Sequence, residues 1–350
     1  MPDANATAVS GVVDVSRRDS SPDAWRKRLA AYAKPDALRA TRQLAVTAFL
    51  FLACMAALLY GLDHAYWLAG LFVVPAALFV VRLFIIQHDC GHVSFFASRR
   101  TNEIVGLVIS ALTLMPYGSW RRTHAAHHAT AGNLDRRGTG DIATLTVAEY
   151  LSQPAWRKLL YRVYRNPLVL FGIGPVYILL IHNRFPGRST RRDRQSWISV
   201  FGTDAAGAAI AIGASLLLGP ATFLLAWGAV LFLATSIGMW LFCVQHQFED
   251  TYWERSATWD FGAAAIEGSS YYDLPRILHW FTGYIGLHHI HHLASKIPNY
   301  HLRACLEQNQ ELQRAKRLTL WASIKSARLA LWDEERRKLV SFRQAAAFCA

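Results

Sequence analysis

The sequence predicts an all-helical integral membrane protein, with four transmembrane helices in two hairpins and a cytoplasmic helical cap that holds a histidine-rich site for two metal ions. Hydrophobic residues make up 53% of the 350 residues, and the mean hydropathy is +0.17. Several runs are nearly free of charge and approach the roughly 20 residues that cross a bilayer. Most of the histidines gather in short clusters beside these runs.

Four apolar runs are expected to cross the membrane, over residues 43–61, 66–87, 200–219 and 221–244. The second run carries one charged residue, Arg82, and the fourth carries none. Short links, a turn before Tyr66 and the single residue Pro220, would fold the runs into two hairpins. The first run follows a long polar stretch without a cleavage site, so it is a span and not a signal peptide.

The chain divides into three predicted parts. Residues 1–24 are small and polar and are expected to be a disordered lead. Residues 25–312 form the membrane domain, and residues 313–350 are expected to form a cytoplasmic helical tail. The five cysteines include no CxxC pair, which argues against a disulfide framework or a thiolate metal site.

The formal net charge of +13 comes from basic residues that flank the spans. They gather before the first span, between residues 157 and 194, and after Lys296. Such clustering follows the positive-inside rule and places both termini and the metal site in the cytoplasm, against anionic lipid. Charge placed in this way excludes nucleic acid as the expected partner.

The histidine clusters are the chemical signal. "QHDCGH", "RRTHAAHH", "VQHQFED" and "GLHHIHHL" supply nine candidate metal ligands: His88, His92, His124, His127, His128, His246, His288, His291 and His292. Residues three and four apart share a helix face, so the ring nitrogens within each cluster should converge on one volume. Nine ligands are too many for one zinc ion and suit two ions with four or five each. Imidazole ligands alone leave iron, copper, nickel and zinc open.

Other nearby residues have smaller expected roles. His289 should point away from the face that its neighbours share, and His64, His182, His279 and His301 are expected to be ordinary histidines. Three acids lie close in sequence to candidate ligands and could orient the imidazoles by accepting their second N–H: Asp89, Glu249 and Asp250.

In order and spacing, "HDCGHVSFF", "HAAHH", "VQHQFEDTYW" and "GLHHIHHLASKIPNYHL" resemble the boxes of the membrane fatty acid desaturases, in particular the bacterial acyl-lipid branch of this histidine-box family. The resemblance covers roughly Trp25 to Leu312. His88 and His92 match the first box, and His246 matches the additional histidine after the last span. The second and third boxes are matched by His124, His127 and His128 and by His288, His291 and His292.

This resemblance implies two non-haem iron ions, dioxygen as co-substrate, and a location in the bacterial inner membrane. The implied reaction inserts a cis double bond into the acyl chain of a membrane lipid, with the delta-12 or omega-6 type as one form. An unactivated methylene has no acidic proton and no polar bond for acid–base catalysis, so its oxidation needs a redox-active metal. Zinc has no accessible redox states, and a hydrocarbon substrate therefore favours iron. The alternative is a di-iron hydroxylase or ketolase acting on lipid, carotenoid or alkane.

The reaction needs electrons from another protein. The sequence has no nucleotide-binding fingerprint and no fused haem segment, so a separate donor such as ferredoxin is expected. The basic loop at residues 184–194 would suit either an acidic carrier or anionic lipid. A metal transporter is disfavoured because the spans are nearly uncharged.

Overall fold

The computed structural model describes residues 22–138, 140–187 and 190–348. Within these residues four helical segments are long and apolar enough to cross a membrane. They are α2 (Ala37–His64), α3 (Tyr66–Gly91), α9 (Arg194–Leu218), and the continuous segment of α10 (Pro220–Phe223), the π-helix η6 (Leu224–Gly228) and α11 (Ala229–His246).

Helices α2 and α9 begin six residues before the predicted apolar runs, because each is capped by an aspartate ahead of the run. Asp36 accepts a hydrogen bond from Arg39 N at 2.9 Å and begins α2 ahead of residue 43. Asp193 caps α9 in the same way, accepting from the backbone N–H groups of Gln195 and Ser196. Hydrophobicity locates the spans, and capping residues set their ends.

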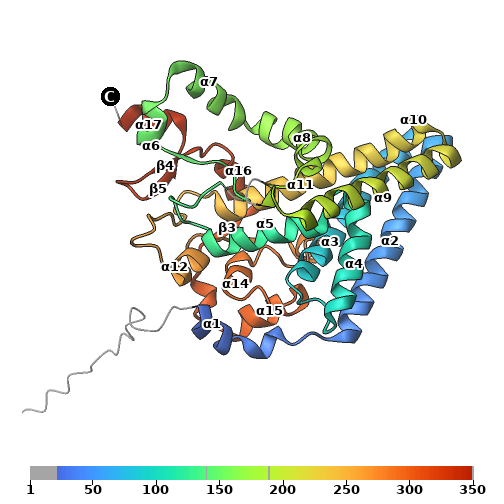
Figure 1. The fold of residues 1–350 in the computed structure, drawn as a ribbon, viewed down its shortest axis with the longest axis horizontal. Helices are drawn as coiled ribbons and strands as arrows, with labels where there is room; N and C mark the ends of the chain where they lie inside the picture. Colours follow the sequence, from blue (N-terminus) through green and yellow to red (C-terminus); the bar gives the residue numbers. More distant parts are fainter. Residues whose placement is uncertain (1–21, 139, 188–189, 349–350) are drawn as a thin grey trace, which may run out of the picture.

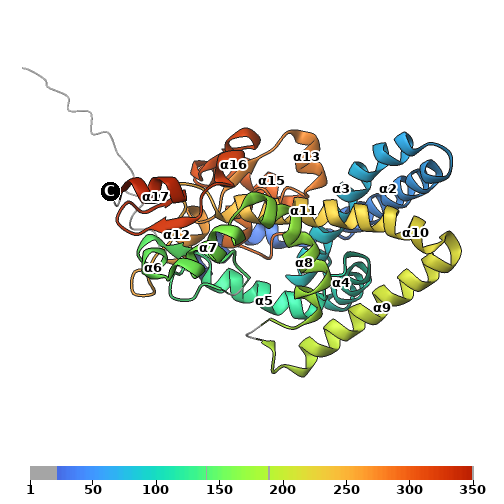
Figure 2. The ribbon, with the colours of Figure 1, turned by 90° about the horizontal axis from the view of Figure 1, so that it is seen from above.

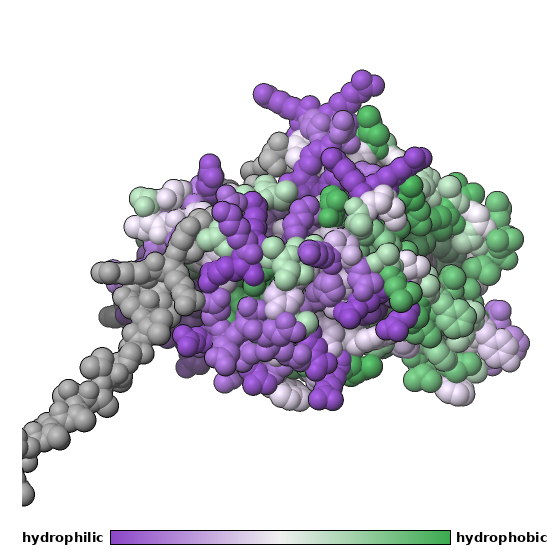
Figure 3. All heavy atoms as spheres, turned by 90° about the horizontal axis from the view of Figure 1, so that it is seen from below, coloured by the Kyte–Doolittle hydropathy of each residue, from purple (hydrophilic) through white to green (hydrophobic). Residues whose placement is uncertain are grey.

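The long helices reach the same end of the molecule, and apolar surface gathers there. Figure 2 shows α2, α3, α9 and α10 extending to one side, and Figure 3 shows hydrophobic atoms concentrated over that end. The exposed side chains include Phe49, Leu52, Trp67, Leu217 and Leu224. Large exposed apolar side chains of this kind match a surface that faces lipid.

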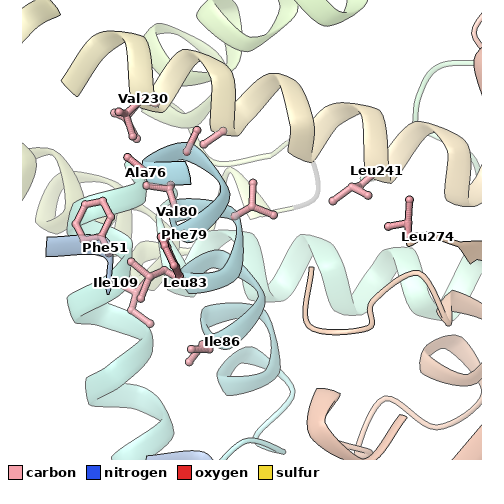
Figure 4. Close-up of a cluster of buried hydrophobic side chains, with 14 of the residues drawn as sticks. Phe51, Ala76, Phe79, Val80, Leu83, Ile86, Ile109, Val230, Leu241 and Leu274 are labelled. Atoms are coloured by element: carbon pink, nitrogen blue, oxygen red, sulfur yellow. The ribbon is translucent and has the colours of Figure 1, made fainter. Parts of the chain in front are cut away.

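Helix α3 is the central element of this bundle. It packs against α2, α4 (Arg99–Thr113) and α11, and its second half is almost wholly buried. Figure 4 shows Phe51 of α2, Phe79 and Leu83 of α3, and Ile109 of α4 in one cluster, with Val230 of α11 beside it. Burial fixes the rotation of α3, and therefore the direction in which His88 points.

The segment after α3 doubles back to the metal-site region. Helices α4 and α5 (Tyr117–Thr130) are bent by 102° at a short break. Pro116 favours an extended residue before it, and Leu114 adopts a left-handed conformation with φ of 52°. Ser110 stabilises the bend by donating to Met115 O at 2.7 Å. The turn carries the second histidine cluster to the end of α3.

Short helices connect α5 to α9. They are α6 (Val147–Ser152), α7 (Ala155–Tyr164), the π-helix η3 (Val169–Ile173), α8 (Gly174–Leu180) and the 3₁₀ turn η4 (His182–Arg184). The α7 and α8 segments are bent by 59°. Large apolar side chains remain exposed along α7.

The chain after α11 forms most of the cap around the histidines. Its helices are α12 (Phe261–Ile266), α13 (Arg276–Phe281), α14 (His288–Leu293), α15 (Asn299–Gln308), η7 (Leu312–Arg314), α16 (Leu320–Ser326) and α17 (Phe342–Phe348). At the N-terminal end, Trp25 of α1 (Pro22–Arg28) and Leu29, just before η2 (Ala30–Ala33), lie in one buried cluster with Ile290 and Leu293 of α14.

Two small sheets correct the all-helical prediction. Strand β1 (Leu145–Thr146) runs parallel to β4 (Leu331–Asp333), which pairs antiparallel with β5 (Lys338–Val340). Strand β2 (Tyr271–Asp273) runs parallel to β3 (Arg317–Thr319).

The tail at 313–350 is therefore not purely helical, because its short segments find backbone partners in the cap. Asp333 also accepts from the N–H groups of Glu335 and Arg336 and so forms the turn between β4 and β5. At the other end of the chain, residues 22–24 of the predicted disordered lead belong to α1, and residues 1–21 lie outside the described residues.

The close contact between α2 and α3 gives a test of this packing. A Cβ atom at Gly61 would lie 2.4 Å from the backbone nitrogen of Ala69, whereas a Cβ at Gly70 would meet nothing within 4 Å. We expect Gly61→Ala to destabilise the protein by about 1–3 kcal/mol because backbone atoms would have to move. Gly70→Ala is the matched control. Thermal unfolding in one detergent measures both, and equal melting temperatures would contradict the packing.

Candidate metal centre

All nine predicted histidines lie together in the structure, in two groups. The first group contains His88, His92, His124, His128 and His291. The second contains His127, His246, His288 and His292. Within each group the candidate ligand atoms lie within 4.8 Å of one another. Five segments supply them: the end of α3, the residue that follows it, α5, the end of α11, and α14 (Figure 1).

Each HxxHH box is split between the groups, which corrects the expectation that all three rings of a box converge. In α5, His124 and His128 join the first group while His127 joins the second. In α14 the pattern is reversed, because His288 and His292 join the second group and His291 the first. Residues four apart differ by about 40° around a helix, whereas adjacent residues differ by about 100°. Each helix therefore gives a pair to one group and a single ring to the other.

Hydrogen bonds between side chains and the backbone on either side of α14 hold it in this position. Gln245, next to His246, donates to Ile285 O at 3.0 Å, just ahead of the third box. Gly286 passes so close to β2 that a Cβ atom there would lie 2.5 Å from Tyr272 O. On the far side of the box, Asp89 accepts from Asn299 N at 2.7 Å. The glycine that opens "GLHHIHHL" therefore permits the close approach that places the histidines.

The ring nitrogens are spaced as ligands of a shared ion. His291 Nε2 lies 3.0 Å from His128 Nε2, and His128 Nε2 lies 3.1 Å from His124 Nε2. In the second group, His246 Nε2 lies 3.1 Å from His127 Nε2 and 3.0 Å from His288 Nε2. Two nitrogens bound about 2.1 Å from one ion at a right angle are about 3 Å apart. The spacing therefore fits imidazoles around a metal.

The protonation of the second group points the same way. His246 Nδ1 lies 3.0 Å from Gly268 O, which can only accept, so Nδ1 carries the hydrogen and Nε2 presents a lone pair. His127 Nδ1 lies 2.6 Å from Asp141 Oδ1, and an ionised carboxylate likewise requires the hydrogen on Nδ1. In the neutral imidazole with its hydrogen on Nδ1, the second nitrogen carries a lone pair, and the Nε2 atoms of His127 and His246 face each other in this way. Two facing lone pairs repel each other, and a cation bound to both nitrogens would replace this repulsion with attraction.

Burial keeps the imidazoles neutral. Desolvation, strengthened by neighbouring imidazoles, lowers the pKa of His92, His288, His291 and His292 well below the ordinary histidine value. These rings are therefore uncharged at neutral pH, and their lone pairs are available to a metal. His92 Nε2 is buried and has no hydrogen-bond partner among the described residues.

Of the three predicted orienting acids, one lies at the site. Asp89 Oδ1 accepts from His88 Nδ1 at 3.0 Å, while its other oxygen holds Asn299. Glu249 and Asp250 are exposed, and their carboxylates pair with lysines: both with Lys338, and Asp250 also with Lys316. The expectation for these two was wrong because α11 ends at His246, so they leave its helix and their side chains lie exposed.

Asp141 is the acid that the sequence did not indicate. It lies in the loop after α5, and its second oxygen, Oδ2, is buried without a hydrogen-bond partner among the described residues. A cavity of about 10 Å³ adjoins it, lined by His127, His246 and Thr251 among others. No spacing rule links Asp141 to His127, because an irregular loop joins them. A glycine directly before the acid, in "GTGDI", is the one local hint of a close approach.

The remaining histidines lie outside the groups. His289 is buried, and its Nε2 lies 3.0 Å from Leu312 O, so it points away from its neighbours as the helix spacing predicts. His301 Nδ1 contacts Tyr32 O at 2.9 Å. A further aromatic contact closes one side of the first group, where Trp120 stacks on His124 with ring centroids 4.6 Å apart.

Comparison with known proteins gives a consistent result. Residues 65–323 match the family model for fatty acid desaturases. The chain is 44% identical over 317 residues to a fatty acid desaturase of Bacillus subtilis, covering 91% of this chain and 90% of that protein.

Two Synechocystis proteins match a smaller part. The chain is 30% identical over 229 residues to an sn-1 oleoyl-lipid 12-desaturase, covering 63% of this chain and 62% of that protein. It is 31% identical over 241 residues to an sn-1 acyl-lipid omega-3 desaturase (ferredoxin), covering 64% and 62%. The family match over most of the chain, together with the 44% identity, shows that this oxidoreductase belongs to the fatty acid desaturase family.

Proposed function

We propose that this chain is an O2-dependent acyl-lipid desaturase that inserts a cis double bond into a membrane acyl chain, at the delta-12 (omega-6) position. The close approach of the ring nitrogens within each histidine group carries the proposal, because lone pairs of neutral imidazoles that meet within about 3 Å call for a cation. The position of the double bond is supported by the similarity to an oleoyl-lipid 12-desaturase. The relatives compared above are all named as desaturases, which disfavours the hydroxylase or ketolase alternative.

The proposed ligands are the two groups of five and four histidines, each holding one iron ion. When bound, the iron pair supplies the redox chemistry with dioxygen that removes two hydrogens from adjacent acyl carbons. Two electrons and two protons complete the reduction of dioxygen to water. Asp89 and Asp141 orient His88 and His127 by accepting their Nδ1 hydrogens. The access of water to the centre is limited by the burial of His88, His127, His288, His291 and His292.

The proposed topology places both termini and the metal centre on the cytoplasmic side of the inner membrane. Four spans return the chain to the side on which it started, and the basic residues flank the corresponding span ends. The two bent helix pairs are proposed to enter the membrane surface without crossing it. Electrons are proposed to come from a separate carrier such as ferredoxin, in line with the name of one relative.

The direct test of this function is a lipid profile. A bacterial host that contains oleoyl lipids and a reduced ferredoxin system should gain a second double bond at carbon 12 when it expresses the chain. His291→Ala should abolish the product because it removes a ligand from the first group. His289→Gln, in the same helix but outside both groups, is the matched control. Mass spectrometry that locates double bonds would refute the proposal if it found a hydroxyl or keto product instead.

Metal content tests the division into two groups. His292→Ala should lower the iron bound by the second group while the first group, which has five other ligands, retains its ion. Iron per chain is measured on purified protein, with His289→Gln again as the control. Complete retention of both ions in His292→Ala would contradict the assignment.

Asp141 should act as a positioning residue. We expect Asp141→Asn to weaken iron binding about 10- to 100-fold, because the carboxylate no longer fixes the hydrogen on His127 Nδ1. Glu249→Gln is the control, since that acid lies close to His246 in sequence but faces solvent. Competition with a chelator measures the affinity. Equal affinities in the two variants would show that Asp141 plays no such part.

A further inference from the structure

A cleft rich in arginine lies apart from the histidine groups. It has a volume of about 470 Å³ and lies between the end of α7, the segment after α16, and α17. Figure 1 shows α7 and α17 near each other, on the opposite side of the molecule from the tips of the long helices. Four arginines line the cleft together with small and apolar residues: Arg162, Arg165, Arg328 and Arg343.

The arginine at the base of the cleft is buried and incompletely bonded. Arg165 is 5% exposed and donates to Leu329 O at 2.7 Å and to Gln247 Oε1 at 2.9 Å. Its Nε has no hydrogen-bond partner among the described residues. A buried cation without a carboxylate partner is costly, so an anion in the cleft would stabilise it.

The rim adds positive charge, and the described residues place no carboxylate against it. Arg162 donates to Tyr150 OH and lies over the ring of Phe342. Arg328 and Arg343 are exposed, and their side chains form no hydrogen bond with the part of the chain that the structure describes. In that same part, no carboxylate forms an ion pair with any of the four arginines. The basic loop before α9 differs, because Arg184 pairs there with Asp204.

Helix α7 has an exposed apolar face on the side opposite Arg165. Trp156, Leu159, Leu160 and Val163 are 58%, 62%, 59% and 48% exposed, and their spacing places them on one stripe. A helix with an apolar stripe and basic residues on its other side lies in the interface of a bilayer. At that depth the neighbouring anions are lipid phosphates.

We propose that this cleft binds the phosphate group of a membrane phospholipid. Guanidinium groups match phosphate oxygens in geometry and charge, and a concave site with a buried arginine at its base suits a small anionic group better than the broad surface of a protein. The bound lipid would lie beside Gln247, and hence beside the segment that carries His246. The inference rests on the membrane location in the proposed function and does not depend on the metal chemistry.

The test uses the purified full chain in detergent and three probes. Dioctanoylphosphatidylglycerol carries the phosphate, dioctanoylglycerol has the same chains without it, and inorganic phosphate represents the free anion. The variant is the double substitution Arg328→Gln with Arg343→Gln, which spares the buried Arg165. The matched control is Arg157→Gln with Arg192→Gln, because it removes the same charge from exposed positions outside the cleft. Calorimetry gives the affinities, and thermal unfolding checks that the variants are folded.

We expect the double variant to bind phosphatidylglycerol at least about tenfold more weakly than the control, with unchanged binding of dioctanoylglycerol. Wild-type affinity in the double variant would overturn the inference. Inorganic phosphate that binds as tightly as phosphatidylglycerol would overturn the lipid source. Intact lipid binding with lost electron transfer from reduced ferredoxin would assign the cleft to an acidic protein instead.

The same samples separate this inference from the proposed function. Lipid binding is measured without turnover, and iron per chain is measured beside it. A wild-type chain that binds the phospholipid but forms no double bond would overturn the proposed reaction and leave the cleft assignment standing.

Discussion

The rings of His127 and His246 face each other through their Nε2 atoms, 3.1 Å apart, beside a cavity of about 10 Å³. Gly268 O and Asp141 each contact the Nδ1 atom of one ring, which favours the tautomer whose Nε2 carries a lone pair. Most of the architecture around the centre can be understood as the means of holding such lone pairs together: a buried helix α3, a sharp bend before α5, and a short helix α14 fixed at both ends.

Helices α5 and α14 each contribute histidines to both groups, which brings the two candidate ion sites close together. Each helix gives an i, i+4 pair of histidines to one group and its remaining histidine to the other. His128 and His292 stack across the boundary, with ring centroids 4.2 Å apart. Two adjacent metal ions would suit the proposed two-electron reaction with dioxygen.

The long apolar helices and the nine clustered histidines could be recognised in the sequence because both signals are local. Apolar length identifies a span, and helical spacing identifies a shared face. The split of each box depends on how α5 and α14 are rotated relative to each other, which tertiary packing decides. Asp141 could not be predicted because an irregular loop joins it to His127. The prediction for Glu249 assumed that the helix of His246 continues, but α11 ends at His246. The tail strands depend on distant partners such as β1.

The central claim is that each histidine group holds one iron ion. X-ray diffraction recorded on both sides of the iron absorption edge, from crystals of the iron-loaded chain, locates the ions directly. The account predicts two iron peaks, one among the five rings around His291 and one among the four rings around His246. A single peak shared by both groups, or a catalytically active protein that holds only zinc, would contradict it.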